Sequence, residues 1–148
     1  MEFTMNPIGV IRSPFTDKTQ TPIQPTRSDA TGTVEIYPQF VEGLLDIEGF
    51  SHIILLYVFH QSDGYSLRVK PFLDDQLRGL FATRYPRRPN PIGLSVVRLL
   101  RRRENILEIE GVDVLDGTPL LDIKPYVPDF DVRTETRTGW YEFRTNRE

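Results

Sequence analysis

Cysteine is absent from this chain of 148 residues, which excludes both a disulfide framework and a metal site built on thiolates. Histidine is scarce, because only His52 and His60 are present, and on one extended strand they would lie about 26 Å apart, too far to share a metal ion. The sequence also lacks a signal peptide and a long apolar run, since the longest, residues 53–59, is far shorter than a membrane span. We therefore expect a cytoplasmic protein that uses neither a membrane nor a metal.

The common nucleotide-binding loops are also missing. No two glycines are spaced as GxG and no GxxxxGK[ST] run occurs, which disfavours a Rossmann fold. The net charge of −3 gives the whole molecule no long-range attraction for a polyanion. Between Arg84 and Arg103, however, seven arginines occur without any Asp or Glu, which predicts a local basic face. The alternative interpretation is an ordinary solvated arginine surface.

Proline and glycine are abundant, with 12 and 10 residues, and their spread along the chain leaves little room for long helices. The intervening segments are rich in β-branched and aromatic residues, and Asp116-Gly117 is typical of a turn. Strands without amphipathic helices between them indicate an all-β fold, a small antiparallel or mixed barrel of one sheet with few short helices. No repeat or linker divides the chain, so we expect one domain over residues 1–148. The expected strands are residues 8–13, 33–37, 53–59, 65–72, 79–83, 92–100, 106–114 and 120–127, with one short helix within 39–47.

Three further segments suggest how this domain is arranged. The continuous apolar run 53–59 predicts a central strand that is covered on both faces. Residues 14–32 are polar and rich in Pro and Thr, and a loop of this length is usually functional or disordered. The aromatic residues Trp140, Tyr141 and Phe143 predict a tail that packs back on the barrel or on a second subunit.

The sharpest motif is TRYPRRPNPIGL, residues 83–94. Its three prolines fix φ and remove three backbone donors, so the segment must be an ordered loop outside the strand ladder. Asn90 stands between two prolines with its amide displayed, and Arg84, Arg87 and Arg88 offer planar donor groups to carboxylate or phosphate oxygens. The alternative is a surface proline turn with incidental charge.

Two weaker candidate sites lie on strands. His60 and Gln61 end the apolar strand and can face a polar ligand, although a histidine bonded to the backbone is an equally ordinary role. Asp122, Lys124 and Tyr126 fall on one face of a strand at period two, and an ion pair on a wet sheet face would explain them as well as a binding site.

Taken together, TRYPRRPNPIGLS, DGTPLLDIKPYVPDFD and FSHIILLYVFHQ resemble the TsaA-like (TrmO, or YaeB-like) family, and PIGVIRSPF and the QPT triplet extend the likeness nearly to the N-terminus. The resemblance implies an S-adenosylmethionine-dependent methyltransferase with a β-barrel, a homodimer with the cofactor near the subunit interface. It implies a tRNA substrate, methylated on the exocyclic N6 of threonylcarbamoyl-adenosine beside the anticodon. Bacterial members carry a C-terminal extension that is not found in these 148 residues.

The resemblance also implies where ligands bind. The cofactor contacts that it implies are Gln24, Pro25, Thr26, His60, Gln61, Arg84, Leu94, Asp113, Val114, Leu115 and Asp116.

Methyl transfer from a sulfonium needs alignment and exclusion of water more than a strong base. We hypothesise that Asn90 accepts a hydrogen bond from the N6 amine, by analogy with the Asn-Pro-Pro-Tyr motif of other amino-methyltransferases. Asp122 or Tyr126 then takes the proton or holds the base, and Arg84 neutralises the cofactor carboxylate. The residues expected to contact tRNA phosphates are Arg87, Arg88, Arg101, Arg102 and Arg103, with Tyr85 stacking on a base.

Two other functions are compatible with the sequence. One is a noncatalytic module that binds S-adenosylmethionine or RNA, and the other is a methyltransferase that acts on a small molecule or a different RNA.

Overall fold

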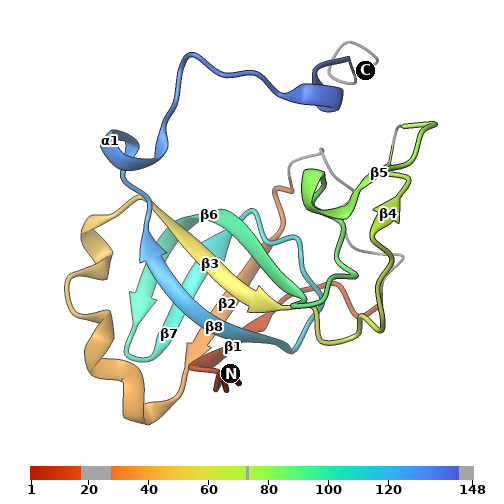
Figure 1. Ribbon diagram of the computed structural model, residues 1–148. Helices are drawn as coiled ribbons and strands as arrows, with labels where there is room; N and C mark the ends of the chain where they lie inside the picture. The colour runs from red at the N-terminus through yellow and green to blue at the C-terminus, as the bar shows by residue number, and fades with distance from the viewer. Residues whose placement is uncertain (18–27, 73, 144–148) are drawn as a thin grey trace.

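The computed structural model describes residues 1–17, 28–72 and 74–143, and in this part of the chain six strands form a closed antiparallel barrel (Figure 1). Around the barrel the order is β1-β2-β7-β6-β3-β8, with β8 paired to β1. The prediction of a small all-β barrel is confirmed. The barrel strands are β1 (Gly9–Arg12), β2 (Thr31–Ile36), β3 (His52–Val58), β6 (Ile92–Arg103), β7 (Ile106–Glu110) and β8 (Thr118–Pro125).

Strand β3 pairs with β6 on one side and with β8 on the other, but every strand of the closed barrel has two neighbours, so β3 is not a central strand in the predicted sense. The expectation that both of its faces are covered is wrong. Ile53, Leu55 and Tyr57 are buried inside the barrel, whereas Ile54 and Leu56 face outward and are only partly covered. A barrel has one interior, so a strand that is apolar at every position must leave half of its apolar side chains on the outer face.

The core fills the barrel with aliphatic side chains at alternate positions of each strand. Ile11 and Val34 come from β1 and β2, Val97 from β6, Leu107 from β7 and Leu120 from β8, and none is more than 1% exposed. Each such burial contributes roughly 1.5–3 kcal/mol relative to exposure.

The strands predicted at 65–72 and 79–83 are wrong in extent. Only β4 (Arg68–Val69) and β5 (Arg78–Gly79) pair there, as a separate two-stranded sheet beside the barrel, and the 3₁₀ turn η3 (Leu80–Ala82) follows β5. The intervening chain is held instead by side chains, since Nε of Arg78 donates a 2.7 Å hydrogen bond to the buried carboxylate of Asp74.

Short helices connect or extend the barrel. The helix predicted within 39–47 is found as two 3₁₀ helices, η1 (Pro38–Leu44) and η2 (Ile47–Gly49), which are separated by Asp46 in the left-handed region at φ 72°. After β8 come α1 (Pro128–Asp131) and the 3₁₀ helix η4 (Gly139–Phe143). None of the helices in the described ranges is long and apolar enough to cross a membrane.

The antiparallel strand order brings four connections to one end of the barrel, which we call the mouth. They are residues 13–17 and 28–30, which adjoin β1 and β2, the residues after β3, the proline segment 83–91 before β6, and the turn 111–117 between β7 and β8. At the opposite end, which we call the base, β3 and η1 meet the β6–β7 hairpin and the end of β8.

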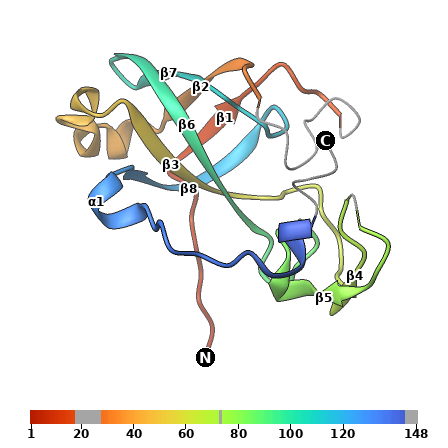
Figure 2. The same cartoon turned by 90° about the horizontal axis from the view of Figure 1, so that it is seen from above.

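The tail returns to the chain near the mouth. From α1 it runs outside the barrel to η4, which lies beside β5 in both views (Figures 1 and 2). Nε1 of Trp140 donates a 2.7 Å hydrogen bond to the carbonyl of Ala82, and the guanidinium of Arg78 lies 5.9 Å from the centre of the Trp140 ring. The tail thus returns to the chain, but its contacts are with η3 and β5 beside the barrel, whereas the sequence predicted packing on the barrel itself or on a second subunit.

Candidate functional site

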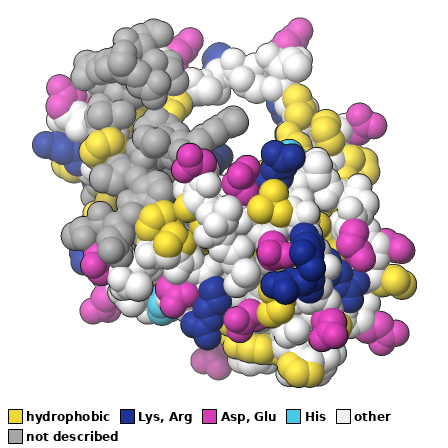
Figure 3. Space-filling view, turned by 180° about the vertical axis from the view of Figure 1, so that it is seen from behind, with side chains coloured by type: hydrophobic (Ala, Val, Ile, Leu, Met, Phe, Trp, Pro, Cys, Tyr) yellow, Lys and Arg dark blue, Asp and Glu magenta, His cyan; other side chains and the backbone are white. Residues whose placement is uncertain are grey.

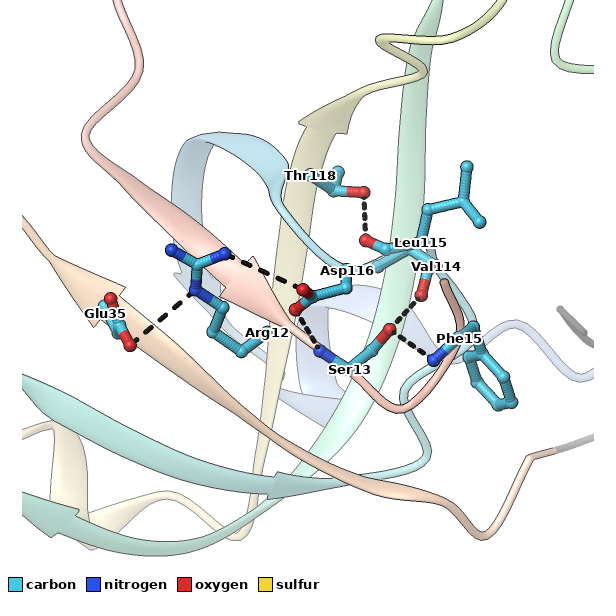
Figure 4. A network of polar contacts seen from close by, with 8 residues as sticks. All are labelled: Arg12, Ser13, Phe15, Glu35, Val114, Leu115, Asp116 and Thr118. Atoms are coloured by element: carbon cyan, nitrogen blue, oxygen red, sulfur yellow. Dashed lines mark hydrogen bonds and ion pairs between the residues drawn. The ribbon is translucent and has the colours of Figure 1, made fainter. Parts of the chain in front are cut away.

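The turn Asp113 to Asp116 is tied firmly to strand β1 (Figure 4). Oγ of Ser13 donates to the carbonyl of Val114 at 2.6 Å, and the Ser13 amide donates to Oδ1 of Asp116 at 3.1 Å. The amide of Asp116 donates in turn to the carbonyl of Phe15 at 2.7 Å. These contacts join positions about a hundred residues apart in the chain, and they hold the turn in one conformation at the mouth.

A second set of contacts holds the inner side of the same turn. Oγ of Ser95 on β6 donates a 2.7 Å hydrogen bond to Oδ1 of Asp113, and the Ser95 oxygen lies 2.7 Å from the hydroxyl of Tyr57 on β3. Both Tyr57 and Ser95 are buried, at 3% and 8% exposure.

Burial changes the acidity of this group of side chains. It raises the pKa of Asp113 above its ordinary range, and the Ser95 hydrogen bond opposes that shift only in part. Burial, together with the nearby charge of Asp113, also raises the pKa of Tyr57 well above its usual value, whereas Ser95 and Arg84 act in the other direction. Tyr57 is therefore a neutral hydrogen-bond donor at every physiological pH.

The proline segment is ordered, as predicted, and an arginine clasps it. Nη1 of Arg88 donates to the carbonyls of Thr83 and Tyr85, both at 2.9 Å. At the end of the segment the amide of Phe59 donates to the carbonyl of Pro91 at 2.8 Å, which continues the β3–β6 ladder by one bond. Asn90, just before this bond, is exposed at the mouth, and Arg87 is exposed as well.

The other expected cofactor residues fall at the mouth, with one exception. His60 and Gln61 follow β3 and are exposed, and Arg84 is exposed next to η3. The triplet Gln24, Pro25 and Thr26 lies outside the described residues. The structure thus brings together the end of β3, the proline segment and the turn Asp113 to Asp116.

Leu94 is the exception, because it lies on the outer face of the barrel. It is 51% exposed, whereas its neighbour Ser95 points inward to Asp113. In the sheet register Leu94 of β6 lies opposite Leu56 of β3, and Leu56 lies opposite Asp122 of β8. Asp122 also forms a 3.1 Å ion pair with Lys124. This contact agrees with the alternative interpretation of these residues, an ion pair on a solvated sheet face.

The structure does not bring Tyr126 to Asn90 within one chain. The amide of Tyr126 donates to the carbonyl of His52, at the start of β3, while Ile92 pairs with Val58 at the end of that strand. Six residues of extended strand separate these two points by roughly 20 Å. Tyr126 therefore lies at the base.

The arginine cluster 101–103 also lies at the base, and it has partners. Nε of Arg101 and Nε of Arg103 lie 3.4 and 3.5 Å from the same oxygen of Glu108. Arg102 donates to the carbonyls of Leu44 and Glu104. Figure 3 shows basic side chains interspersed with acidic ones on the back of the molecule, in place of a large patch of one sign. This arrangement fits the alternative of a solvated, paired arginine surface.

Sequence reasoning missed Tyr57, Ser95 and Ser13. The signal for the first two was present, because a tyrosine and a serine at inward positions of apolar strands need hydrogen-bond partners. Only the strand register identifies Asp113 as that partner. Ser13 had no signal, because its contacts depend on the distance between β1 and the turn in the folded barrel.

Residues 10–132 match the family described as "tRNA-methyltransferase O N-terminal domain". A probable S-adenosyl-L-methionine-binding protein from Pyrococcus abyssi is 59% identical over 92% of this chain and 74% of its own length. A tRNA (adenine(37)-N6)-methyltransferase from Mus musculus is 38% identical over 84% of this chain and 31% of its own length. The crystal structure of TrmO from Pseudomonas aeruginosa superposes with a TM-score of 0.79 at 46% identity, covering 94% of this chain and 62% of the crystallised one. The chain therefore spans less than two thirds of that crystallised relative.

Proposed function

This chain belongs to the family of tRNA-methyltransferase O N-terminal domains, and we propose that it transfers a methyl group from S-adenosylmethionine to the exocyclic N6 of a tRNA adenine. The observation that carries the proposal is that the β3 end, the proline segment and the β7–β8 turn meet at the mouth, where the turn holds a partly buried carboxylate, Asp113. The names of the relatives support it, since the Pyrococcus protein is named for binding the cofactor and the mouse protein for methylating N6 of adenine 37.

The residues at the mouth fit a cationic cofactor. Within the described ranges no Lys, Arg or His side chain forms an ion pair with Asp113. A partly buried carboxylate is stabilised by a nearby positive charge, and S-adenosylmethionine carries two, a sulfonium and an ammonium. We place it against Asp113 and the backbone of Val114, Leu115 and Asp116, with Gln24, Pro25, Thr26, His60 and Gln61 as further contacts and Arg84 facing its carboxylate.

The cofactor, when bound, supplies an activated methyl group, and the chain's own residues then align the acceptor. The backbone amide of Ile92 donates a 2.7 Å hydrogen bond to the backbone carbonyl of Asn90, which fixes the backbone from which the Asn90 side chain projects. The side-chain amide oxygen of Asn90 accepts a hydrogen bond from the N6 amine and orients the nitrogen lone pair. With the cofactor bound, the N6 nitrogen would take its methyl group, and the N6 proton would leave to a carboxylate or to water.

We further propose that the adenine is threonylcarbamoyl-adenosine beside the anticodon. The name of the mouse relative places its target at position 37, which adjoins the anticodon. The threonyl group carries a carboxylate, and the exposed guanidinium of Arg87 at the mouth suits such a group or an adjacent phosphate.

A homodimer explains the position of Leu94, and we propose that the protein forms one. Leu94 and Asp113 lie on opposite faces of the barrel wall, so one small ligand reaches both only if a second copy presents its outer face to the mouth. That face is apolar, since Leu94, Val96 and Leu100 are each about half exposed next to Ile54 and Leu56. Asp122 lies in the same row as Leu94, so the second copy would bring Asp122 to the site as a candidate proton acceptor; Tyr126, at the base, is not included.

For the tRNA contact we propose Arg87 as the main phosphate ligand. Arg88 does not bind phosphate in this proposal; it holds the proline segment, from which Arg87 projects, through its hydrogen bonds to Thr83 and Tyr85. Arg101, Arg102 and Arg103 lie at the base with acidic or carbonyl partners, so their part in binding is minor. A protein that modifies tRNA works in the cytoplasm, where we place it.

Label transfer tests the proposal. Purified protein is incubated with methyl-labelled S-adenosylmethionine and either bulk tRNA or tRNA from cells that cannot form threonylcarbamoyl-adenosine, and the product nucleoside is identified by mass spectrometry. We expect N6-methylated threonylcarbamoyl-adenosine from the first tRNA and none from the second. Transfer that tRNA does not stimulate would assign the activity to another substrate, and Asn90→Ala with full activity would remove that residue from the mechanism.

The second candidate is a noncatalytic cofactor-binding module. The Pyrococcus relative is named only for binding the cofactor, and this chain covers only 31% of the mouse methyltransferase. Tight cofactor binding without label transfer to any RNA would favour this alternative.

A further inference from the structure

Three polar side chains form a line from the interior of the barrel to the cofactor turn. Tyr57 lies on β3, Ser95 on β6 and Asp113 in the turn after β7, and the two links between them are each 2.7 Å long. The remaining inward neighbours on these strands, such as Leu55 and Val97, are aliphatic. A buried hydroxyl pair in such a core costs stability unless each polar atom is bonded, so its position at the mouth calls for an explanation.

The direction of the hydrogen bonds in this line follows from counting protons. A serine hydroxyl has one proton, and that of Ser95 is donated to Asp113. The Ser95 oxygen must then accept from Tyr57, whose phenol keeps its proton because its pKa is strongly raised. Both hydroxyl protons therefore point toward Asp113, and its carboxylate must act as a hydrogen-bond acceptor.

We propose that Tyr57 and Ser95 are positioning residues that keep the Asp113 carboxylate ionised and aimed at a cationic group of the bound cofactor. The inference rests on the proposed function, since it takes the cofactor as the ligand at Asp113. Neither residue touches the cofactor in this arrangement: both act through the carboxylate. Its consequence is that cofactor affinity depends on pH through Asp113.

Other charged and titratable groups lie around the turn in the described part of the chain. Tyr57 faces Asp113 from β3, and Arg84, from the segment before β6, acts electrostatically on Tyr57. At the far end of the turn the carboxylate of Asp116 lies 3.8 Å from Nη1 of Arg12. His60 follows β3 and is exposed near the mouth, and histidine is a side chain that can change charge between pH 5 and 8, so a His60→Gln variant must accompany the series.

The sign of the effect is determined by the contacts. The ionised form of Asp113 binds the cation, so affinity is lost as the pH falls through its raised pKa. The Ser95 hydrogen bond lowers that pKa, so Ser95→Ala moves the loss of affinity to higher pH. Tyr57→Phe makes Ser95 a poorer donor and shifts the profile the same way by less. Asp113→Asn weakens binding by about tenfold or more at pH 8, where Asp113 of the parent is ionised, and it removes the pH dependence.

Calorimetric titration of S-adenosylmethionine between pH 5 and 8, without tRNA, tests the inference. Ser51→Ala and Tyr37→Phe, which change exposed residues remote from the mouth, are the matched controls. We expect Ser95→Ala and Tyr57→Phe to lose more affinity at pH 5.5 than at pH 8, and the controls to follow the parent. A loss equal at every pH, or a parental profile, would overturn the positioning role.

Two additions keep the test decisive. Tyr57→Phe retains the ring and thus the packing, so it reports even if Ser95→Ala does not fold, and ¹³C NMR titration of the Asp113 carboxyl in the ligand-free protein must show the same order of pKa values. A pH-linked affinity without methyl transfer to tRNA would refute the proposed function and leave this inference intact. Absence of cofactor binding at pH 8 would refute both.

Discussion

Gly93 lies directly against the ring of Tyr57, so closely that a Cβ at position 93 would overlap ring atom Cε2 of Tyr57 and would stand 2.7 Å from Cζ of Phe59. The glycine of the NPIGL sequence is therefore needed for space inside the barrel. It allows the Tyr57 ring to lie across β6, where its hydroxyl reaches Ser95.

Gly93→Ala is thus expected to destabilise the fold by about 1–3 kcal/mol, because the ring of Tyr57 cannot yield without leaving its hydrogen bond. Cofactor affinity should fall with it. Thermal unfolding and calorimetry measure the two effects, with Gly43→Ala as the control, since nothing lies within 4 Å of a Cβ placed there. Equal melting temperatures for the two variants would contradict the steric argument.

The link between β1 and the cofactor turn yields a second prediction. Ser13→Ala removes the 2.6 Å bond to the carbonyl of Val114 and should cost about 1 kcal/mol while lowering cofactor affinity. Arg12→Ala is the matched control, since its ion pairs to Glu35 and Asp116 are 3.8 Å long and half exposed, and such pairs contribute little. Denaturant unfolding and cofactor titration compare the two, and a larger loss in Arg12→Ala would reverse the assignment.

Much of the fold was predictable because it depends on local chemistry. Proline and glycine spacing indicated short strands, and the apolar run 53–59 was correctly predicted to form a strand, β3. The chain from Tyr65 to Thr83 was wrongly predicted as two full strands. It pairs only briefly, as β4 and β5 outside the barrel, and apolar side chains such as Leu67, Phe72 and Leu77 stay exposed, which no local pattern distinguishes.

For the site, the motif residues identified the mouth, but its support came from contacts that only the fold creates. Ser95 meets Asp113 across 18 positions, and Arg102 meets the carbonyl of Leu44 across 58. The latter contact explains why an arginine cluster expected at RNA phosphates lies at the base: Arg102 ties η1 to β6. Charge alone could not distinguish a structural arginine from a binding one.

Asp113 makes the third prediction, which concerns stability. Burial raises the pKa of Asp113 in the folded protein above the ordinary value of 3.8, which applies to the unfolded chain. At a pH between the ordinary and the raised pKa, the native state therefore holds a proton that the unfolded chain has released. Stability contributed by this group is therefore lost as the pH rises through that window. Asp113→Asn has no charge to bury, and it should be more stable than the parent at pH 7 although it binds cofactor poorly.

Chemical denaturation at pH 4, 5.5 and 7 measures this effect. The advantage of Asp113→Asn should shrink as the pH approaches 3.8, whereas Asp129→Asn, which alters an exposed carboxylate of α1, should follow the parent. If the Asp113→Asn and parent curves stay parallel across this range, burial does not raise the pKa of Asp113.

Two neighbouring arginines in the proline segment supply the last prediction. Arg88→Met keeps an unbranched aliphatic side chain but removes the guanidinium, which lies over the Phe81 ring and donates to the carbonyls of Thr83 and Tyr85. The segment therefore loosens and Asn90 loses its alignment. Misplacement of a catalytic group by about 1 Å costs up to a hundredfold, so kcat should fall by about tenfold or more. Arg87→Ala leaves the clasp intact and should keep kcat, raise KM for tRNA and reduce the salt slope of binding by about one. Methylation kinetics at two salt concentrations separate these effects. The control variant Arg101→Ala/Arg103→Ala is expected to match the parent. A lower kcat in Arg87→Ala than in Arg88→Met would exchange the two roles.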